Sequence, residues 1–170
     1  MKKLLLFSLT VLLFSCQPAT ERHIGFHPNP DKDVAGNGWY LGTNEAIDVV
    51  VELDKVWKKW DYESMRTFFA DSVQITTSRG QRYTTPEAYF TPMKERDFSN
   101  YSWEIMSVHS VDIKPGAGGE HVQARLKNSW KDTLGNTNNS YSIESYYVVD
   151  GKIVWLDQFV QRPVKENTED

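Results

Sequence analysis

The stretch from Asn44 to Thr77 constrains the fold most, because it sets the order of the first elements. Its apolar residues recur at helical intervals as far as Trp60, and its charged residues fall mostly on the other side. Asn44 is expected to cap this long helix, and Asp61 is expected to cap a short second helix. An alternating strand is expected from Val73. Two amphipathic helices therefore precede the first strand and need a sheet to bury their apolar faces.

From Tyr101 onward the apolar pattern changes to period two, which is typical of strands. The alternation breaks around Ser107, and this break predicts a β-bulge that bends the strand. Further strands are expected over 121–130, 141–149 and 153–160, and Asp150-Gly151 is expected to form a tight hairpin turn between the last two. The pattern predicts an α+β fold in which a curved antiparallel sheet wraps around the N-terminal helices.

Apolar residues occupy both faces of the last two strands. A sheet whose back is solvated would carry polar residues on one face. Two explanations stay open. The segment around Trp39, Tyr40 and Leu41 could cover the back of the sheet, or two copies of the chain could pack sheet to sheet as a homodimer.

The N-terminal segment is expected to be a targeting signal. Two lysines precede an apolar run that is too short to span a bilayer comfortably, and the run ends at Leu13-Phe14-Ser15-Cys16. This ending resembles the lipobox of bacterial lipoproteins, in which the cysteine is lipidated and becomes the first mature residue. The resemblance implies a lipid anchor on Cys16, with the membrane as partner. The implied location is the cell envelope. In the best-known sorting scheme for lipoproteins, an aspartate directly after the lipidated cysteine retains the protein in the inner membrane. Gln17 stands at that position, which implies the outer membrane.

The 170 residues favour one folded domain, which we expect over residues 44–162. Residues 1–15 would be the signal peptide, 16–43 a tether rich in proline and glycine, and 163–170 a disordered tail. Loss of the signal would lower the net charge from −4 to −6, because two lysines leave with it. That charge argues against nucleic acid as a partner. No phosphate-binding loop or cluster of metal ligands is visible, so neither a metal nor a cofactor is expected.

Two local segments carry a resemblance to a known family. FFADSVQI, over 68–75, matches its step from helix to first strand, and YYVVDGKIVWLDQF, over 146–159, matches its terminal hairpin. The order of elements over 44–161 is similar to the NTF2-like superfamily, in its SnoaL-like branch. The resemblance implies a cone in which helices close over a concave sheet and enclose an apolar pocket. Members include isomerases, cyclases, dehydratases and domains that only bind, so the resemblance leaves function open.

The catalytic residues of the similar isomerases are only partly matched. Their base carboxylate would fall near Ile75-Thr76-Thr77, where no acidic residue occurs, and their oxyanion tyrosine would fall near Leu53. Glu144 is a candidate for the second acid, on the penultimate expected strand. The dehydratases of the family use a histidine–aspartate pair, for which His109 or His121 with Asp157 are the candidates. His121 is expected to be exposed.

Polar and aromatic residues could line the expected pocket. Glu144 could act as a general acid or base if burial raised its pKa, or it could be a carboxylate hydrogen-bonded to Arg125, Lys127 or a tyrosine. The candidate catalytic residues are Glu144 and Asp157, and the candidate ligand-binding residues are Trp57, Phe69, Trp103, Asn128, Trp130, Tyr146 and Gln158. The aromatic residues could equally fill the pocket.

The sequence favours a lipid-anchored, non-catalytic NTF2-like domain that binds a small apolar ligand or a protein partner. The missing base near Ile75 and the surplus of aromatic residues support this reading. The alternative is a SnoaL-like isomerase, cyclase or dehydratase that uses Glu144 in its pocket.

Overall fold

The computed structural model describes residues 23–26, 38–116 and 118–161. The expected signal peptide, with Cys16, and the expected tail lie outside these described residues. Within them, no helix is long and apolar enough to cross a membrane.

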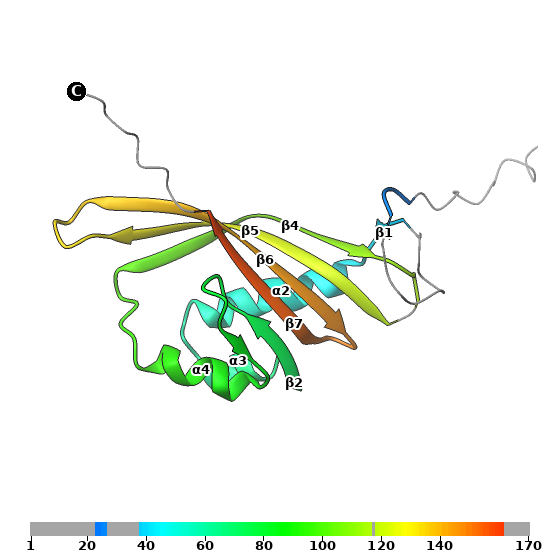
Figure 1. Cartoon of the computed structure of the whole chain (residues 1–170), viewed down its shortest axis with the longest axis horizontal. Helices are drawn as coiled ribbons and strands as arrows, with labels where there is room; N and C mark the ends of the chain where they lie inside the picture. The colour runs from blue at the N-terminus through cyan, green and yellow to red at the C-terminus, as the bar shows by residue number, and fades with distance from the viewer. Residues whose placement is uncertain (1–22, 27–37, 117, 162–170) are drawn as a thin grey trace, which may run out of the picture.

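One curved sheet of seven strands forms the larger part of the domain (Figure 1). Its strand order is β1-β4-β5-β6-β7-β2-β3, and all neighbours are antiparallel except β2 and β7. The strands are β1 (Tyr40–Leu41), β2 (Phe69–Thr76), β3 (Arg82–Tyr83), β4 (Tyr101–Asp112), β5 (Gly119–Lys131), β6 (Thr137–Val149) and β7 (Lys152–Gln161). The predicted α+β cone is confirmed, although the sheet is mixed because β2 lies parallel to β7.

Three helices, α2 (Asn44–Trp57), α3 (Tyr62–Arg66) and α4 (Pro86–Lys94), lie on the inner side of this sheet (Figure 1). α2 contacts β4, β5 and β6, and α4 contacts β2 and β3. α2 turns Ala46, Val50, Leu53 and Trp57 inward, and each of these side chains is buried. The helical spacing read from the sequence therefore reports the face that meets the sheet.

The N-cap of α2 is Thr43, so the prediction of Asn44 was wrong. Thr43 has an extended backbone, and its side-chain oxygen accepts a hydrogen bond from the Ala46 amide at 3.3 Å. Glu120 holds Thr43 in place, because its carboxylate accepts bonds from the Thr43 amide at 2.6 Å and hydroxyl at 2.8 Å. A contact from β5 thus decides which of two adjacent polar residues caps the helix. Asp61 caps α3 as expected.

Two further boundaries differ from the sequence prediction. α2 ends at Trp57, and Trp60 lies beyond it with a positive φ of 55°, which is incompatible with a continuing helix. β2 begins at Phe69 and not at Val73, because Phe69 already pairs with Ile153 of β7. The start of β2 thus depends on a contact distant in sequence, which local periodicity does not report.

The bulge and the hairpin turn follow the prediction. The register between β4 and β5 shifts between Ile105 and Ser107, so the strand bends there. Asp150 and Gly151 both have positive φ, at 49° and 72°, which suits the tight turn between β6 and β7.

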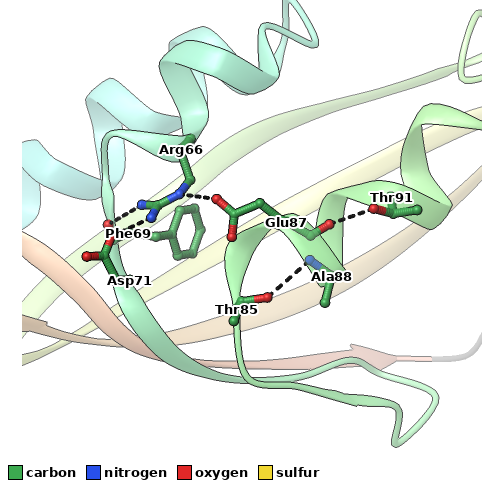
Figure 2. Close-up of polar contacts among 7 residues, drawn as sticks. All are labelled: Arg66, Phe69, Asp71, Thr85, Glu87, Ala88 and Thr91. Carbon is green, nitrogen blue, oxygen red and sulfur yellow. Dashed lines mark hydrogen bonds and ion pairs between the residues drawn. The ribbon is translucent and has the colours of Figure 1, made fainter.

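Arg66 ties three elements of the inner layer together (Figure 2). Its guanidinium contacts Glu87 of α4, pairs with Asp71 at 2.5 Å and donates to the Phe69 carbonyl at 3.1 Å. Thr85 caps α4 by accepting from the Ala88 amide at 3.3 Å. These contacts fix α4 beside β2.

Within the described residues, the back of the sheet is covered at one end. β1 pairs with β4, and the Trp39 ring packs edge-on against His121 at 5.3 Å. Tyr141, Ile143 and Phe159 stay exposed further along the same face, with Phe159 57% exposed. The segment around Trp39 therefore packs on the back of the sheet, as the first of the two explanations for the apolar residues on both faces predicted. The homodimer remains a prediction, and this exposed stripe is where it would form.

Candidate functional site

A cavity of about 280 Å³ opens between α2, the inner face of the sheet and the β2–β3 turn. Its inner wall, called the floor here, consists of Glu144, Tyr146 and Gln158 on β6 and β7. Its exposed lining residues include Ser78, Arg79, Gln81 and Arg96, and these four are called the mouth here. The volume is near the lower end of the range for small-molecule sites, about 300–1,000 Å³.

Glu144 is the central polar group of the floor. Its carboxyl group accepts a hydrogen bond from the Tyr146 hydroxyl at 2.5 Å and another from the Gln158 amide nitrogen at 2.7 Å. Desolvation by burial raises the pKa of Glu144, and the nearby Asp54 carboxylate adds to this rise, whereas the two hydrogen bonds oppose it. A protonated Glu144 keeps one O–H donor for a ligand oxygen, in addition to the bonds it accepts. Of the partners expected from the sequence, the tyrosine is the one found.

Three tyrosines share this polar region. Burial raises the pKa of Tyr146 and of Tyr89 far above the usual value, and Glu144 adds to both effects. Burial, with a contribution from Glu144, also raises the pKa of Tyr101 to about 12. The hydroxyl groups therefore stay protonated near neutral pH, and they can donate hydrogen bonds but not act as bases.

Asp54 is a second carboxylate in the cavity wall. It accepts a hydrogen bond from the Trp103 indole nitrogen at 2.6 Å and forms an ion pair with Lys58 at 2.7 Å. Its side chain is only 12% exposed. The sequence reading did not single out Asp54, although it lies four residues after Val50 and three before Trp57. That spacing places it on the buried face of α2 and could have identified it.

Asn128 of β5 connects β4 and β6 through side-chain hydrogen bonds inside the cavity. Its side-chain oxygen accepts from the Tyr101 hydroxyl at 2.7 Å, and its amide nitrogen donates to the Ser142 hydroxyl at 3.0 Å. With both ends of the amide bonded, Asn128 is held in one orientation. This places a fixed polar group in the same cavity as Glu144.

Aromatic rings form the apolar part of the wall. The Trp60 ring stacks on Phe98 at 4.1 Å and meets Trp103 edge to face at 5.7 Å. Trp57 lies deeper and packs edge to face on Tyr89 at 6.1 Å. These rings border the cavity and leave it open.

The structure brings six of the nine predicted site residues in the folded domain to one cavity. These are Trp57, Trp103, Asn128, Glu144, Tyr146 and Gln158.

Three others lie elsewhere. Phe69 packs edge to face on Phe90 in the core, and Trp130 lies near the far end of β5, opposite Tyr101 and Asn138. Asp157 is next to Gln158 on β7, and adjacent side chains of a strand point to opposite faces, so Asp157 faces the back of the sheet. Its Oδ1 atom is buried there without a hydrogen bond among the described residues.

Neither histidine candidate lines the cavity. His109 is exposed, and its place on β4 opposite Gln123 faces the back of the sheet. His121 is half-buried on that same face and packs against Tyr147 at 4.6 Å, so the expectation that it is exposed was wrong. Thr77, which directly follows β2, lines the cavity but supplies no carboxylate. Within the described residues no group of three or more histidine, cysteine or acidic side chains could hold a metal ion.

Comparison with known proteins identifies the fold through structure. No protein-family model matches the sequence, and no curated protein matches it either. An NTF2-like protein from Burkholderia thailandensis matches with a TM-score of 0.55 at 16% identity, covering 68% of this chain and 90% of its own.

Two matches have names that suggest enzymes. A proposed ketosteroid isomerase from Kribbella flavida matches with a TM-score of 0.59 at 12% identity, covering 74% of this chain and 84% of its own. An LEH-like epoxide hydrolase from M. tuberculosis matches with a TM-score of 0.54 at 14% identity, covering 70% and 84%. At these identities the matches bear on fold alone, and the chain therefore has the NTF2-like α+β cone fold that its sequence predicts.

Proposed function

We propose that this domain binds a small, mainly apolar molecule in the cavity of its cone. The observation that carries the proposal is an open cavity with aromatic rings in its wall and a few fixed polar groups, among them the cluster around Glu144 at its floor. Such a combination of apolar surface and a few fixed polar groups is characteristic of small-molecule sites. Burial raises the pKa of Glu144 and so favours its protonated form, whose O–H group would hydrogen-bond a carbonyl or hydroxyl oxygen of the ligand.

A pair of substitutions at adjacent residues tests this proposal. Val160 lines the cavity and is 46% exposed, whereas Phe159 lies on the opposite face. We expect 2-acetylnaphthalene, an uncharged aromatic ketone, to bind the soluble domain in titration calorimetry. Val160→Trp should weaken this binding at least about tenfold, because a larger side chain occupies the cavity, and Phe159→Trp should leave it unchanged. Absence of binding, or equal effects of the two substitutions, would contradict a ligand in the cavity.

Acid–base catalysis is a second candidate, favoured by the finding that two acidic side chains line one cavity. In this candidate mechanism Asp54 would take a proton from a carbon next to a ligand carbonyl, and Glu144 would hydrogen-bond the carbonyl oxygen. An isomerase would then return the proton from Asp54 to another carbon of the same molecule. Turnover of a β,γ-unsaturated ketosteroid, followed by absorbance of the conjugated product and lost in Glu144→Gln, would favour the enzyme over the simple binding domain.

We also propose that Cys16 carries the lipid that attaches this domain to the bacterial cell envelope. The proposal is supported by the order of basic residues, apolar run and cysteine at the N-terminus. In cells fed radiolabelled palmitate, the full-length chain should take up label and sediment with membranes. Cys16→Ala should abolish both properties, since acyl chains supply the membrane affinity. Membrane sedimentation of an unlabelled Cys16→Ala chain would refute lipid anchoring.

A further inference from the structure

Two arginine side chains at the mouth of the cavity form no ion pair with the described residues. Arg79 lies in the turn between β2 and β3, and Arg96 lies just after α4. Both are exposed, and neither forms an ion pair within the described part of the chain. Arg66, in contrast, contacts two carboxylates. The charge of Arg79 and Arg96 thus remains available to a ligand.

The less exposed part of the cavity wall is acidic. Glu144 and Asp54 both line it, and Asp54 has its own cation in Lys58. An anionic group at the floor would lose its hydration and approach two acidic side chains, which is unfavourable. The same group at the mouth would meet two cations and stay partly hydrated. A basic mouth and an acidic floor therefore orient any ligand that carries one negative charge.

We propose that the natural ligand is an organic acid, with a carboxylate bound by Arg79 and Arg96 and an apolar body inside the cavity. The body would lie against Trp57 and Trp103, and any oxygen at its far end would meet Glu144. Arginine suits this role because its planar group binds a carboxylate through two parallel hydrogen bonds. The inference rests on the proposed function, since it names the class of ligand for the same cavity.

Two probes of the same shape separate the charge from the apolar body. 2-Naphthoate carries a carboxylate where 2-acetylnaphthalene carries an uncharged acetyl group. In titration calorimetry at low salt we expect the double variant Arg79→Gln/Arg96→Gln to weaken 2-naphthoate binding about tenfold and to change 2-acetylnaphthalene binding less than about twofold. Raising the salt concentration to 0.5 M should weaken only 2-naphthoate binding to the wild-type domain, because screening acts on exposed charges.

Arg82→Gln is the matched control. Arg82 is exposed on β3, three residues from Arg79, and it does not line the cavity, so the substitution removes one nearby positive charge, against two in the double variant, without touching the mouth. Unchanged 2-naphthoate binding in Arg82→Gln, together with the loss in the double variant, would support the inference. Equal losses in both would refute it, because only net charge would then matter.

Other outcomes separate this inference from the function on which it rests. If both probes bind and the double variant alters neither, the carboxylate inference fails while the cavity remains a ligand site. If neither probe binds, or Val160→Trp weakens neither, the proposed function fails and the inference fails with it. Circular dichroism of each variant confirms that loss of binding does not come from unfolding.

Discussion

Phe69→Ala is expected to lower the free energy of unfolding by about 3–5 kcal/mol, the usual cost of truncating a buried phenylalanine. Phe69 is 2% exposed, and its ring packs edge to face on Phe90 at 5.8 Å. Its backbone also starts the pairing of β2 with β7. A domain of ordinary stability has about 5–15 kcal/mol in total, so the loss would be a large fraction. Urea denaturation followed by tryptophan fluorescence measures it.

Phe159→Ala provides the control, because it removes the same ring from a position that is 57% exposed on the back of the sheet. We expect a change of about 0.5 kcal/mol or less there. A similar small loss in Phe69→Ala would mean that the core around Phe90 is not packed as described. If Phe69→Ala instead stayed folded and weakened 2-acetylnaphthalene binding, Phe69 would belong to the ligand site, as the sequence alone suggested.

Glu144→Gln is expected to make the domain more stable than the wild type at pH 8, and the difference should shrink as the pH falls towards 4. Burial raises the pKa of Glu144 in the folded state above the ordinary value of 4.5. Between these two pKa values the folded chain binds more protons than the unfolded chain. Wild-type stability therefore falls with rising pH in this window, by at most about 1.4 kcal/mol per pH unit from this group.

The glutamine at position 144 cannot ionise, so the stability of the variant lacks this contribution. Its amide oxygen can accept the bond from Gln158, and its amide nitrogen can donate to the Tyr146 hydroxyl, which reverses the direction of that bond. Chemical denaturation of both proteins from pH 4 to pH 8 gives the difference directly. Glu95→Gln, which removes an exposed carboxylate, should show no comparable pH dependence. If Glu144→Gln followed the wild type at every pH, Glu144 would not be held in its neutral form by the fold.

Local periodicity in the sequence was enough to predict the two N-terminal helices and the five long strands of this domain, although not all of their boundaries. The inward face of α2, the bulge near Ser107 and the turn at Asp150-Gly151 all depend on short-range patterns, and all are found. Such patterns report which face of a helix or strand is buried, because the repeats of 3.6 and 2 residues are intrinsic to the backbone. They also placed Glu144 and Tyr146 on the inner face of β6, where alternate residues point the same way.

Only the tertiary structure decided which buried residues meet at the cavity. Periodicity distinguishes inside from outside, and it does not distinguish a cavity wall, such as Trp57, from a filled core, such as Phe69. The approach of Asp54 to Glu144 depends on how α2 crosses the sheet, and the mouth depends on a turn and a helix end that bring Arg79 and Arg96 to one opening. Sequence thus determined the fold and the polarity of each face, whereas long-range packing determined the site, because distances between elements are set by the side chains that fill the space between them.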